Sequence, residues 1–451
     1  MKIKSISIFV LLSLFTVVLN AQQFDQKEIA VTIYNQNLGV VKDLREITIP
    51  EGVSTIKIVD VAQMIDPTSV HIKLNGDVLE QNYQYDLVSL SKILNKYIDR
   101  NISMISKTGE LIEGKLISAS GGQIVIESNN GGLLMIPNYN EYRINVTALP
   151  EGLITKPTLV WMVNSNTSKK QNVEISYQTG GMNWHAEYVA VLNKDDSMMD
   201  LNSWVSIENN SGTTYKDAKI KLVAGDINRV QQPMPAPRYE KNLAYAVAED
   251  QFEEQSFFEY HIYKLQRPAT VANSETKQIS LFGAEDVSVK KKYIFRCGNY
   301  NQDNGKVNVV VEFTNSEKNN LGVPMPKGKV RVYKSDGDAV EFIGEDFIDH
   351  TPKNEKIRLT IGKAFDIVAK EKMTNHRKIS DRSYEQSWEI ELTNRKETDV
   401  VVDVVKYLGL NWEILKTSDE YTKENATTIL YKIPVKKNSK TKLTLTVRYN
   451  N

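Results

Sequence analysis

The chain has 451 residues with 56 basic and 56 acidic side chains, so its formal net charge is 0 at neutral pH. This balance lacks the clustered basic excess of a nucleic-acid binder, and we expect no nucleic-acid partner. The one cysteine, Cys297, excludes an internal disulfide. The length is sufficient for roughly two to four domains.

The first 21 residues have the pattern of a cleavable export signal. Lys2 and Lys4 give a basic start, an apolar stretch covers residues 6–19, and the small residue Ala21 stands at the expected cleavage point. The apolar stretch is shorter than the about 20 residues that span a bilayer core. No cysteine follows the cut to carry a lipid anchor, and no later segment has the length and apolarity of a membrane span. We therefore expect an exported protein, periplasmic or extracellular, with no membrane-spanning segment in the mature chain.

The first two regions after the signal differ in pattern. Residues 22–85 alternate apolar and polar positions in several short strands, which predicts an N-terminal β region. In residues 86–150, apolar side chains first fall at helical spacing behind Ser89, a helix-capping residue type. About five short strands with Gly-rich turns follow, and this order predicts a small helix-plus-barrel insertion of the Sm-like or SH3-like kind.

The central region contains long alternating strands and one interruption. Residues 151–230 predict a β-sandwich region, in which Trp184 shares a face with Tyr188, while His185 and Glu187 share the other face. Residues 231–262 hold several prolines and an acidic, aromatic stretch without periodicity. We interpret this segment as a surface loop and a candidate docking element.

The C-terminal part returns to regular alternation. Strands recur about every ten residues, which predicts two sandwich-like modules, 263–375 and 376–451. The predicted fold class is therefore mostly β, with multi-domain antiparallel β-sandwiches of immunoglobulin-like type and the small barrel as an insertion.

Catalytic and metal-binding patterns are not found in the sequence. There is no Gly-x-Ser-x-Gly elbow and no phosphate-binding Gly-rich loop. The five histidines include no pair at the spacing of a helical zinc site. Cys297 stands at the end of an apolar strand and is interpreted as a buried small hydrophobe. We accordingly assign no catalytic residue, no metal and no cofactor.

Two polar clusters are candidate ligand-binding residues. Asp226, Asn228 and Arg229 follow a strand and precede the Pro-rich loop, where they suit either a polar ligand or the backbone of a turn. Asp346 and His350 belong to a dense run of acidic residues and histidine and share one face of a predicted strand, with Glu345 on the opposite face.

The five tryptophans are considered as a carbohydrate site, because such a site needs exposed aromatic side chains as platforms. Trp184, Trp204 and Trp388 lie within alternating strands and are predicted to be core residues. Trp412 follows Gly409 near a turn and is the best candidate for exposure.

Five stretches of the chain form a recognisable set. They are IDPTSV (65–70), SYQTGGMNW (176–184), LVAGDINR (222–229), RPATVA (267–272) and FIGEDF (342–347). As a set they resemble the mucoidy-inhibitor-like bacterial proteins, whose shared region is catalogued as a domain of unknown function. The resemblance covers nearly the whole mature chain and implies an exported, envelope-associated β protein, with no accepted reaction, cofactor or catalytic residue. Some members carry a coiled-coil insertion after the first strands, and this chain has no heptads there.

The leading functional hypothesis is a non-catalytic binding or scaffold protein of the bacterial envelope, whose partner is an envelope protein or a surface polymer. Two alternatives remain open. The first is a hydrolase of envelope peptide or glycan, with Asp226, Arg229, Asp346 and His350 in one cleft. The second is a carbohydrate-binding protein with exposed aromatic residues.

Overall fold

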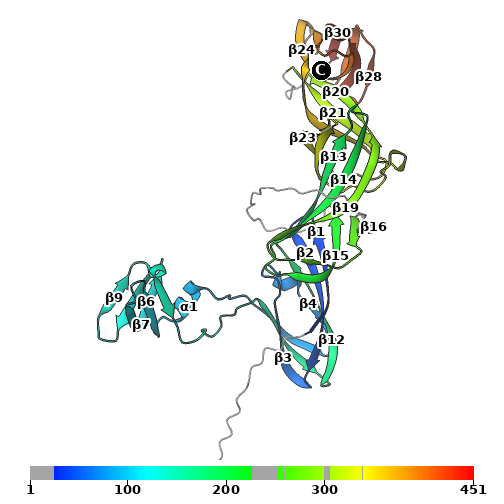
Figure 1. Ribbon diagram of the computed structural model, residues 1–451. Coiled ribbons are helices and arrows are strands. Elements are labelled where there is room, and N and C mark those ends of the chain that lie inside the picture. The colour runs from blue at the N-terminus through cyan, green and yellow to red at the C-terminus, as the bar shows by residue number, and fades with distance from the viewer. Residues whose placement is uncertain (1–24, 226–251, 258–259, 299–304, 338, 451) are drawn as a thin grey trace, which may run out of the picture. The chain divides into compact units, whose positions relative to one another are not determined.

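The structure, a computed structural model, describes residues 25–225, 252–257, 260–298, 305–337 and 339–450 (Figure 1). Strands make up 67% of the structure and helices 4%. The strands form several separate sheets, and the predicted mostly-β, multi-domain sandwich class is confirmed. The predicted export signal lies outside the described residues.

The chain divides into two compact units. Unit 1 comprises Met1–Ala30, Val40–Gly180 and Ser211–Tyr215, and unit 2 comprises Val31–Gly39, Gly181–Asn210 and Lys216–Asn451. In unit 1, one sheet has the order β3-β11-β5, and a second sheet contains β1-β2-β12-β4, of which β1 and β2 include parts of residues 31–39 of unit 2. Their strands are β1 (Asp25–Tyr34), β2 (Leu38–Ile49), β3 (Gly52–Val59), β4 (His71–Lys73), β5 (Asp77–Gln84), β11 (Thr158–Ser165) and β12 (Lys169–Thr179).

The predicted helix-plus-five-strand insertion is present in unit 1. The helix α1 (Leu90–Lys96) is capped by Ser89, whose Oγ accepts a hydrogen bond from the Lys92 N–H at 3.3 Å. The five strands form one sheet in the order β10-β6-β7-β8-β9 around its own apolar core. Among the described residues, no helix has the length and apolarity needed to cross a membrane. The strands are β6 (Asn101–Ser106), β7 (Leu111–Ser120), β8 (Gln123–Ser128), β9 (Leu133–Ile136) and β10 (Tyr142–Asn145). The described residues also contain 3-10 helices at Pro67–Ser69, Tyr139–Glu141 and Glu317–Asn319.

The first part of unit 2 contains a five-stranded sheet with the order β19-β14-β13-β22-β23. Its core face carries the side chains that the alternation predicts, since Trp184 and Tyr188 are almost fully buried. The Tyr188 hydroxyl donates a hydrogen bond to the Pro326 carbonyl at 2.7 Å. A smaller group pairs as β16-β17-β15, with β18 also on β15. The strands are β13 (Met182–Leu192), β14 (Met198–Asn209), β15 (Tyr215–Ala224), β16 (Phe252–Phe257), β17 (Tyr260–Leu265), β18 (Ala269–Val271), β19 (Glu275–Ser288), β22 (Gly328–Ser335) and β23 (Val340–Ile348).

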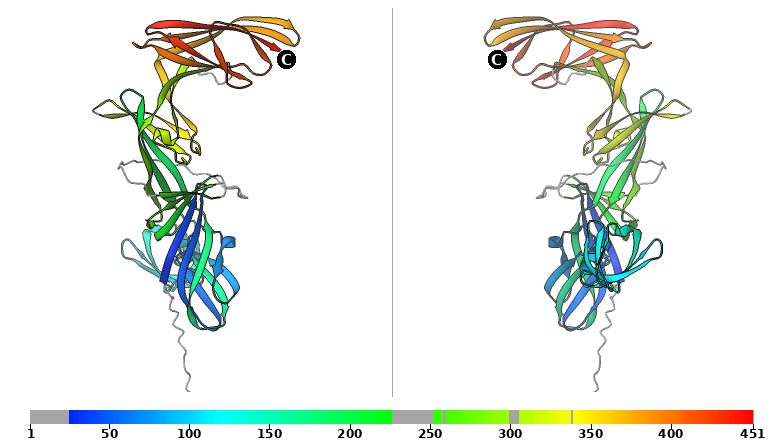
Figure 2. Two further views of the ribbon diagram at one scale, coloured as in Figure 1. Left: turned by 90° about the vertical axis from the view of Figure 1, so that its right-hand side faces the viewer. Right: turned by 90° about the vertical axis from the view of Figure 1, so that its left-hand side faces the viewer.

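The C-terminal strands of unit 2 form a nine-stranded sheet that folds over on itself. Its order is β27-β30-β25-β24-β21-β20-β26-β29-β28. One core joins Ile390 and Leu443 from one half of the sheet to Val402 and Ile433 from the other, and Figure 2 shows the two layers in orange to red. Cys297 is 3% exposed in this core, as predicted. The strands are β20 (Lys290–Cys297), β21 (Lys306–Thr314), β24 (Lys356–Ser380), β25 (Ser383–Asn394), β26 (Val400–Tyr407), β27 (Trp412–Thr417), β28 (Tyr421–Lys423), β29 (Thr428–Val435) and β30 (Ser439–Asn450).

Two predicted boundaries differ from the structure. The end of the predicted 231–262 loop is a hairpin, because β16 pairs with β17 from Phe252 opposite Leu265 to Phe257 opposite Tyr260. Phe252, Phe257 and Tyr260, which were interpreted as loop residues, thus belong to strands, while residues 226–251 and 258–259 lie outside the described part. The predicted division near residue 375 falls inside β24, a single strand of 25 residues, so the sheet has no break there.

Candidate functional site

The first predicted cluster cannot be placed, since Asp226, Asn228 and Arg229 lie outside the described residues. The hydrolase hypothesis depends on Asp226 and Arg229, and it stays a prediction.

The second predicted cluster is described, and its two members bind different segments. The Asp346 carboxylate accepts hydrogen bonds from the N–H groups of Phe347 (2.9 Å) and Thr360 (2.6 Å), which ties β23 to the start of β24. The Nδ1 of His350 accepts a hydrogen bond from the Lys327 N–H at 3.2 Å, just before β22. These hydrogen bonds do not join Asp346 to His350.

A groove with a volume of about 470 Å³ lies beside this cluster, at the end of the sheet where β22 begins and β23 ends. Gly328 faces Ala186 across the parallel pair of β22 and β13. A Cβ atom at residue 328 would overlap the carbonyl oxygen of Ala186, so glycine is required for the strands to come this close. The groove is lined by His185, Ala186, Glu187, Lys327, Gly328, Lys329, Phe347, Ile348 and Asp349.

A network of charged side chains borders the groove. The Arg331 Nη1 lies 3.2 Å from a Glu187 carboxylate oxygen, and its Nε lies 3.8 Å from a Glu345 oxygen. The Arg331 side chain is only 5% exposed, so these two carboxylates compensate a charge that is largely removed from water. Glu345 also binds the Lys329 ammonium at 3.0 Å.

Glu187 is the most strongly perturbed acid of this network. A hydrogen bond from His185, together with Arg331, lowers the pKa of Glu187 to about 2 despite its burial. A carboxylate with so low a pKa is a weak base near neutral pH, where general bases work best with a pKa close to 7. Glu187 is therefore suited to holding Arg331 in place and poorly suited to accepting protons.

Aromatic side chains stand beside the charges on the same face of the sheet. Phe347 lies directly across from Lys329, is 72% exposed, and has the Lys329 ammonium 5.4 Å from its ring centre. A bulge at Ile343 places Phe342, 55% exposed, opposite Tyr333 and thus on this same face. This face of the sheet consequently combines two exposed phenyl rings with a nearly buried arginine, and of these three residues Phe347 lines the groove.

Only part of this site could be predicted from the sequence. The alternation in β13 placed His185 and Glu187 together on the face away from the core, and this is confirmed by their shared network. Arg331 was not singled out, because it lies 144 residues from Glu187 and meets it through the parallel pairing of β13 with β22.

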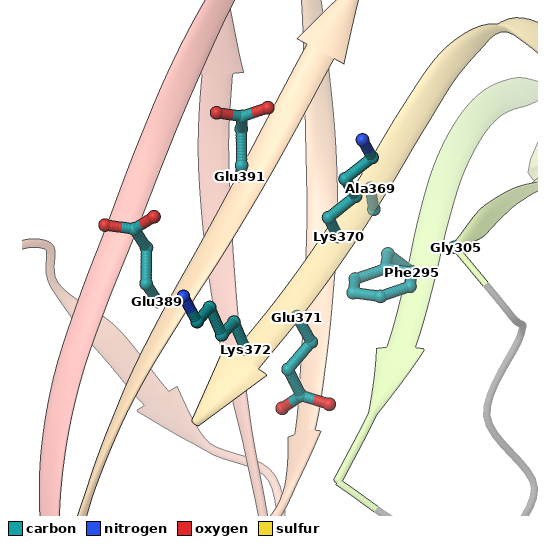
Figure 3. A pocket seen from close by; sticks show the side chains of 8 residues that line it. All are labelled: Phe295, Gly305, Ala369, Lys370, Glu371, Lys372, Glu389 and Glu391. Carbon is teal, nitrogen blue, oxygen red and sulfur yellow. The ribbon is translucent and has the colours of Figure 1, made fainter. Parts of the chain in front are cut away.

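A second hollow, of about 570 Å³, lies in the nine-stranded sheet (Figure 3). Lys370, Glu371 and Lys372 come from β24, and Glu389 and Glu391 come from the neighbouring β25. The Glu371 side chain points away from these two glutamates in Figure 3 and forms an ion pair with the Lys406 ammonium. Phe295, Gly305 and Ala369 complete the lining.

The tryptophans do not form an exposed platform. Trp161 and Trp184 are buried, and Trp204, Trp388 and Trp412 are half-buried. The Trp412 indole donates a hydrogen bond to the Ala426 carbonyl at 2.8 Å, and Lys423 lies over its ring. Burial of these rings counts against the carbohydrate-binding alternative.

Metal chemistry receives no support from the described residues. Among them, no group of three or more His, Cys, Asp or Glu side chains is arranged to hold a metal ion. In particular, His185 has two carboxylates nearby, with its Nε2 3.5 Å from Glu187 and its Nδ1 3.9 Å from Glu208, and neither distance is that of a shared metal.

The fold is that of a multi-domain β-sandwich protein, and the groove lies on the sheet that contains β13, β22 and β23. The family model described as "Domain of unknown function (DUF4139)" matches residues 173–450. This match covers more than half of the chain, and the chain belongs to that family. The matched region includes the groove and all of β24, whereas the helix-plus-strands insertion lies before it. No curated protein matches the chain.

Proposed function

We propose that this chain is an exported, non-catalytic binding protein of the bacterial envelope, of the mucoidy-inhibitor-like kind, and that it binds a partner protein in the groove beside Arg331. The observation that carries the proposal is the combination of Arg331, held between Glu187 and Glu345, with the exposed rings of Phe342 and Phe347. Protein interfaces are enriched in arginine and aromatic residues, which supply most of the binding energy.

The groove also suggests what the partner contributes. Its volume lies within the range of small-ligand sites, and its floor at Gly328 and Ala186 lacks long side chains. Because Arg331 and Lys329 already have carboxylate partners, a further acidic group gains little here. An apolar side chain that packs against Phe347 fits the groove better.

The experiment uses the full chain, produced with its export signal. N-terminal sequencing of protein from the envelope fraction is expected to begin at Gln22. Envelope extract is then passed over immobilised wild-type protein, Phe347→Ser and Phe365→Ser. Phe365 is the control because it is 95% exposed and does not line the groove.

We expect one envelope protein to be retained by the wild type and by Phe365→Ser, with at least tenfold weaker binding to Phe347→Ser. Because Phe347 is largely exposed, its replacement should leave the fold intact. Equal retention by all three proteins would contradict the groove as the binding site. Recovery of full-length protein in the cytoplasm alone would contradict the export proposal.

A further inference from the structure

The strand β24 has an open edge in its second half. β21 pairs with β24 from Lys356 to Val368, and β25 pairs with it from Ile367 to Ser380. Beyond Val368, β24 therefore has a ladder partner on one side only, as far as the described residues extend. The Ala369 N–H donates a hydrogen bond to Gly305 O at 3.0 Å on the open side. Backbone groups alternate along a strand, so the N–H and C=O of Glu371 and Met373 point to that same side.

Charges on one face of this sheet alternate in sign from strand to strand. In one row, Lys370 lies opposite Glu391, which lies opposite Lys442. In the next row, Lys372 lies opposite Glu389. Diagonal ion pairs connect the rows, with 2.9 Å between Lys440 and Glu391 and 3.0 Å between Lys442 and Glu389.

The longest row shows the same alternation over four strands. Arg377 of β24, Glu385 of β25, Arg448 of β30 and Glu413 of β27 lie opposite one another in turn. Glu385 binds Arg448 at 2.8 Å and Arg377 at 2.6 Å. Hydrogen bonds from Arg448 and Arg377 also lower the pKa of Glu385 below its usual value.

Each of these rows ends at the open edge with a cation. Arg377 lies on the same face as Lys370 and Lys372 because of the bulge at Thr374. The residues of β25 opposite these three cations are Glu391, Glu389 and Glu385, which share one face because β25 has no bulge between them. A strand added beside β24 would continue the alternation only if it presented acidic side chains to these cations. Opposite charges across a strand pair are stabilising and like charges are destabilising.

This charge pattern distinguishes between two possible occupants. Two copies of the chain that joined edge to edge would bring the cations of one β24 against those of the other, which is unfavourable. An acidic extended segment meets no such repulsion. The hollow of Figure 3 lies at the start of the edge, where Lys370 and Lys372 of β24 line it together with Glu389 and Glu391 of β25.

We propose that the open edge of β24, from Lys370 to Arg377, binds an extended acidic segment of a partner polypeptide, which adds to the sheet as a further strand. This surface is separate from the groove on β13, β22 and β23. Strand addition gains its affinity from main-chain hydrogen bonds and its specificity from alternate side chains. Exposed lysines on an edge also prevent unwanted pairing, so reversal of the charge is the deciding perturbation.

The test uses the full chain and three fluorescent peptides with alternating Thr-Glu, Thr-Gln and Thr-Lys sequences. Fluorescence anisotropy is expected to show at least tenfold tighter binding of the Thr-Glu peptide than of the Thr-Gln peptide. The Lys370→Glu/Lys372→Glu variant should lose at least tenfold in affinity for Thr-Glu and prefer Thr-Lys. The control Lys432→Glu/Lys437→Glu carries the same charge change on exposed residues of β29 and the turn after it, and should stay within twofold of the wild type.

A second variant tests the backbone rather than the charge. Met373→Pro removes an N–H that points to the open side, and edge strands tolerate proline at such positions. It should abolish binding of the Thr-Glu peptide, and hydrogen exchange of the wild type should slow at residues 370–378 when the peptide is bound. Equal affinity of the three peptides, or protection elsewhere without protection of β24, would overturn the proposal. Self-association that Met373→Pro abolishes would also overturn it, in favour of a second copy as occupant.

The Phe347→Ser variant separates the two proposals. It removes a side chain of the groove and should leave binding of the Thr-Glu peptide unchanged. If Phe347→Ser loses partner retention and still binds the Thr-Glu peptide, the groove and the β24 edge are separate binding sites. If wild-type protein binds the Thr-Glu peptide but retains no envelope protein, the proposal for β24 stands and the proposal for the groove fails.

Discussion

Replacement of Glu187 by glutamine tests the charged network beside the groove. Glu187 is 13% exposed and pairs with Arg331, which is 5% exposed. Glutamine keeps the shape and one hydrogen-bond acceptor but removes the negative charge. Arg331 then retains the more distant Glu345 carboxylate, at 3.8 Å from its Nε, as its remaining ionic partner in this network.

The size of the effect follows from the pKa of Glu187. An unperturbed glutamate has a pKa of about 4.3 and one pKa unit corresponds to about 1.4 kcal/mol, whereas the pKa of Glu187 in the folded protein is about 2. The ionised carboxylate therefore stabilises the folded state by about 3 kcal/mol at pH 7. Because the pKa is lowered by folding, this stability is present above about pH 4.3 and is lost as the pH falls towards 2. At pH 3 about 1.4 kcal/mol should remain.

The measurement must report on the sheet itself, since a chain with several domains need not unfold in one step. We suggest urea unfolding followed by hydrogen-exchange mass spectrometry of peptides from β13 and β22, for wild type and Glu187→Gln. The difference in free energy of unfolding should be about 3 kcal/mol at pH 7 and shrink by about half at pH 3. Glu341→Gln, an exposed residue of β23, is the matched control and should stay within about 0.5 kcal/mol of the wild type. A difference that is the same at both pH values would refute the ionic origin of the stability.

Two further predictions concern close packing and a buried charge. Gly328→Ala should lower the free energy of unfolding of its sheet by on the order of 3 kcal/mol, because the new methyl group overlaps the Ala186 carbonyl. Gly362→Ala, where a Cβ meets nothing within 4 Å, should change it by less than about 0.5 kcal/mol, and calorimetry compares the two. Lys406→Met should cost about 3–5 kcal/mol, because it leaves the Glu371 carboxylate buried without its partner. Adding Glu371→Leu should restore most of the loss, and a double variant no more stable than Lys406→Met would contradict the pairing.

Local sequence signals predicted local structure well. The helix α1 begins after Ser89 as its capping pattern indicated, and five strands follow it where about five were expected. The alternation in β13 also placed the correct residues in the core, since Trp184 and Tyr188 are at most 1% exposed. These features depend on residues a few positions apart, where the periods of helix and strand are visible in the sequence.

Predictions that depended on composition were less successful. The aromatic stretch that starts at Phe252 was interpreted as loop because it follows prolines and acidic residues, yet residues 252–257 pair with β17. The expected break near residue 375 failed for a related reason. A β-bulge at Thr374 interrupts the alternation of apolar and polar residues in β24. In the sequence this interruption resembles the end of a strand, although the strand continues through it.

The two candidate surfaces could not be predicted from the sequence, because they depend on the order of the strands in the sheets. The row Arg377–Glu385–Arg448–Glu413 joins four strands, and no window of the sequence shows its alternation of sign. Whether this row ends at an open edge also depends on where the pairing of β21 with β24 ends. Among the described residues, β21 begins at Lys306 and pairs with β24 as far as Val368, which leaves Lys370 and Arg377 on an edge. Cations at the same positions of a central strand would be paired on both sides. The same residues are thus compatible with an internal ion-pair ladder or with a site for an acidic strand, and the length of β21 decides between them.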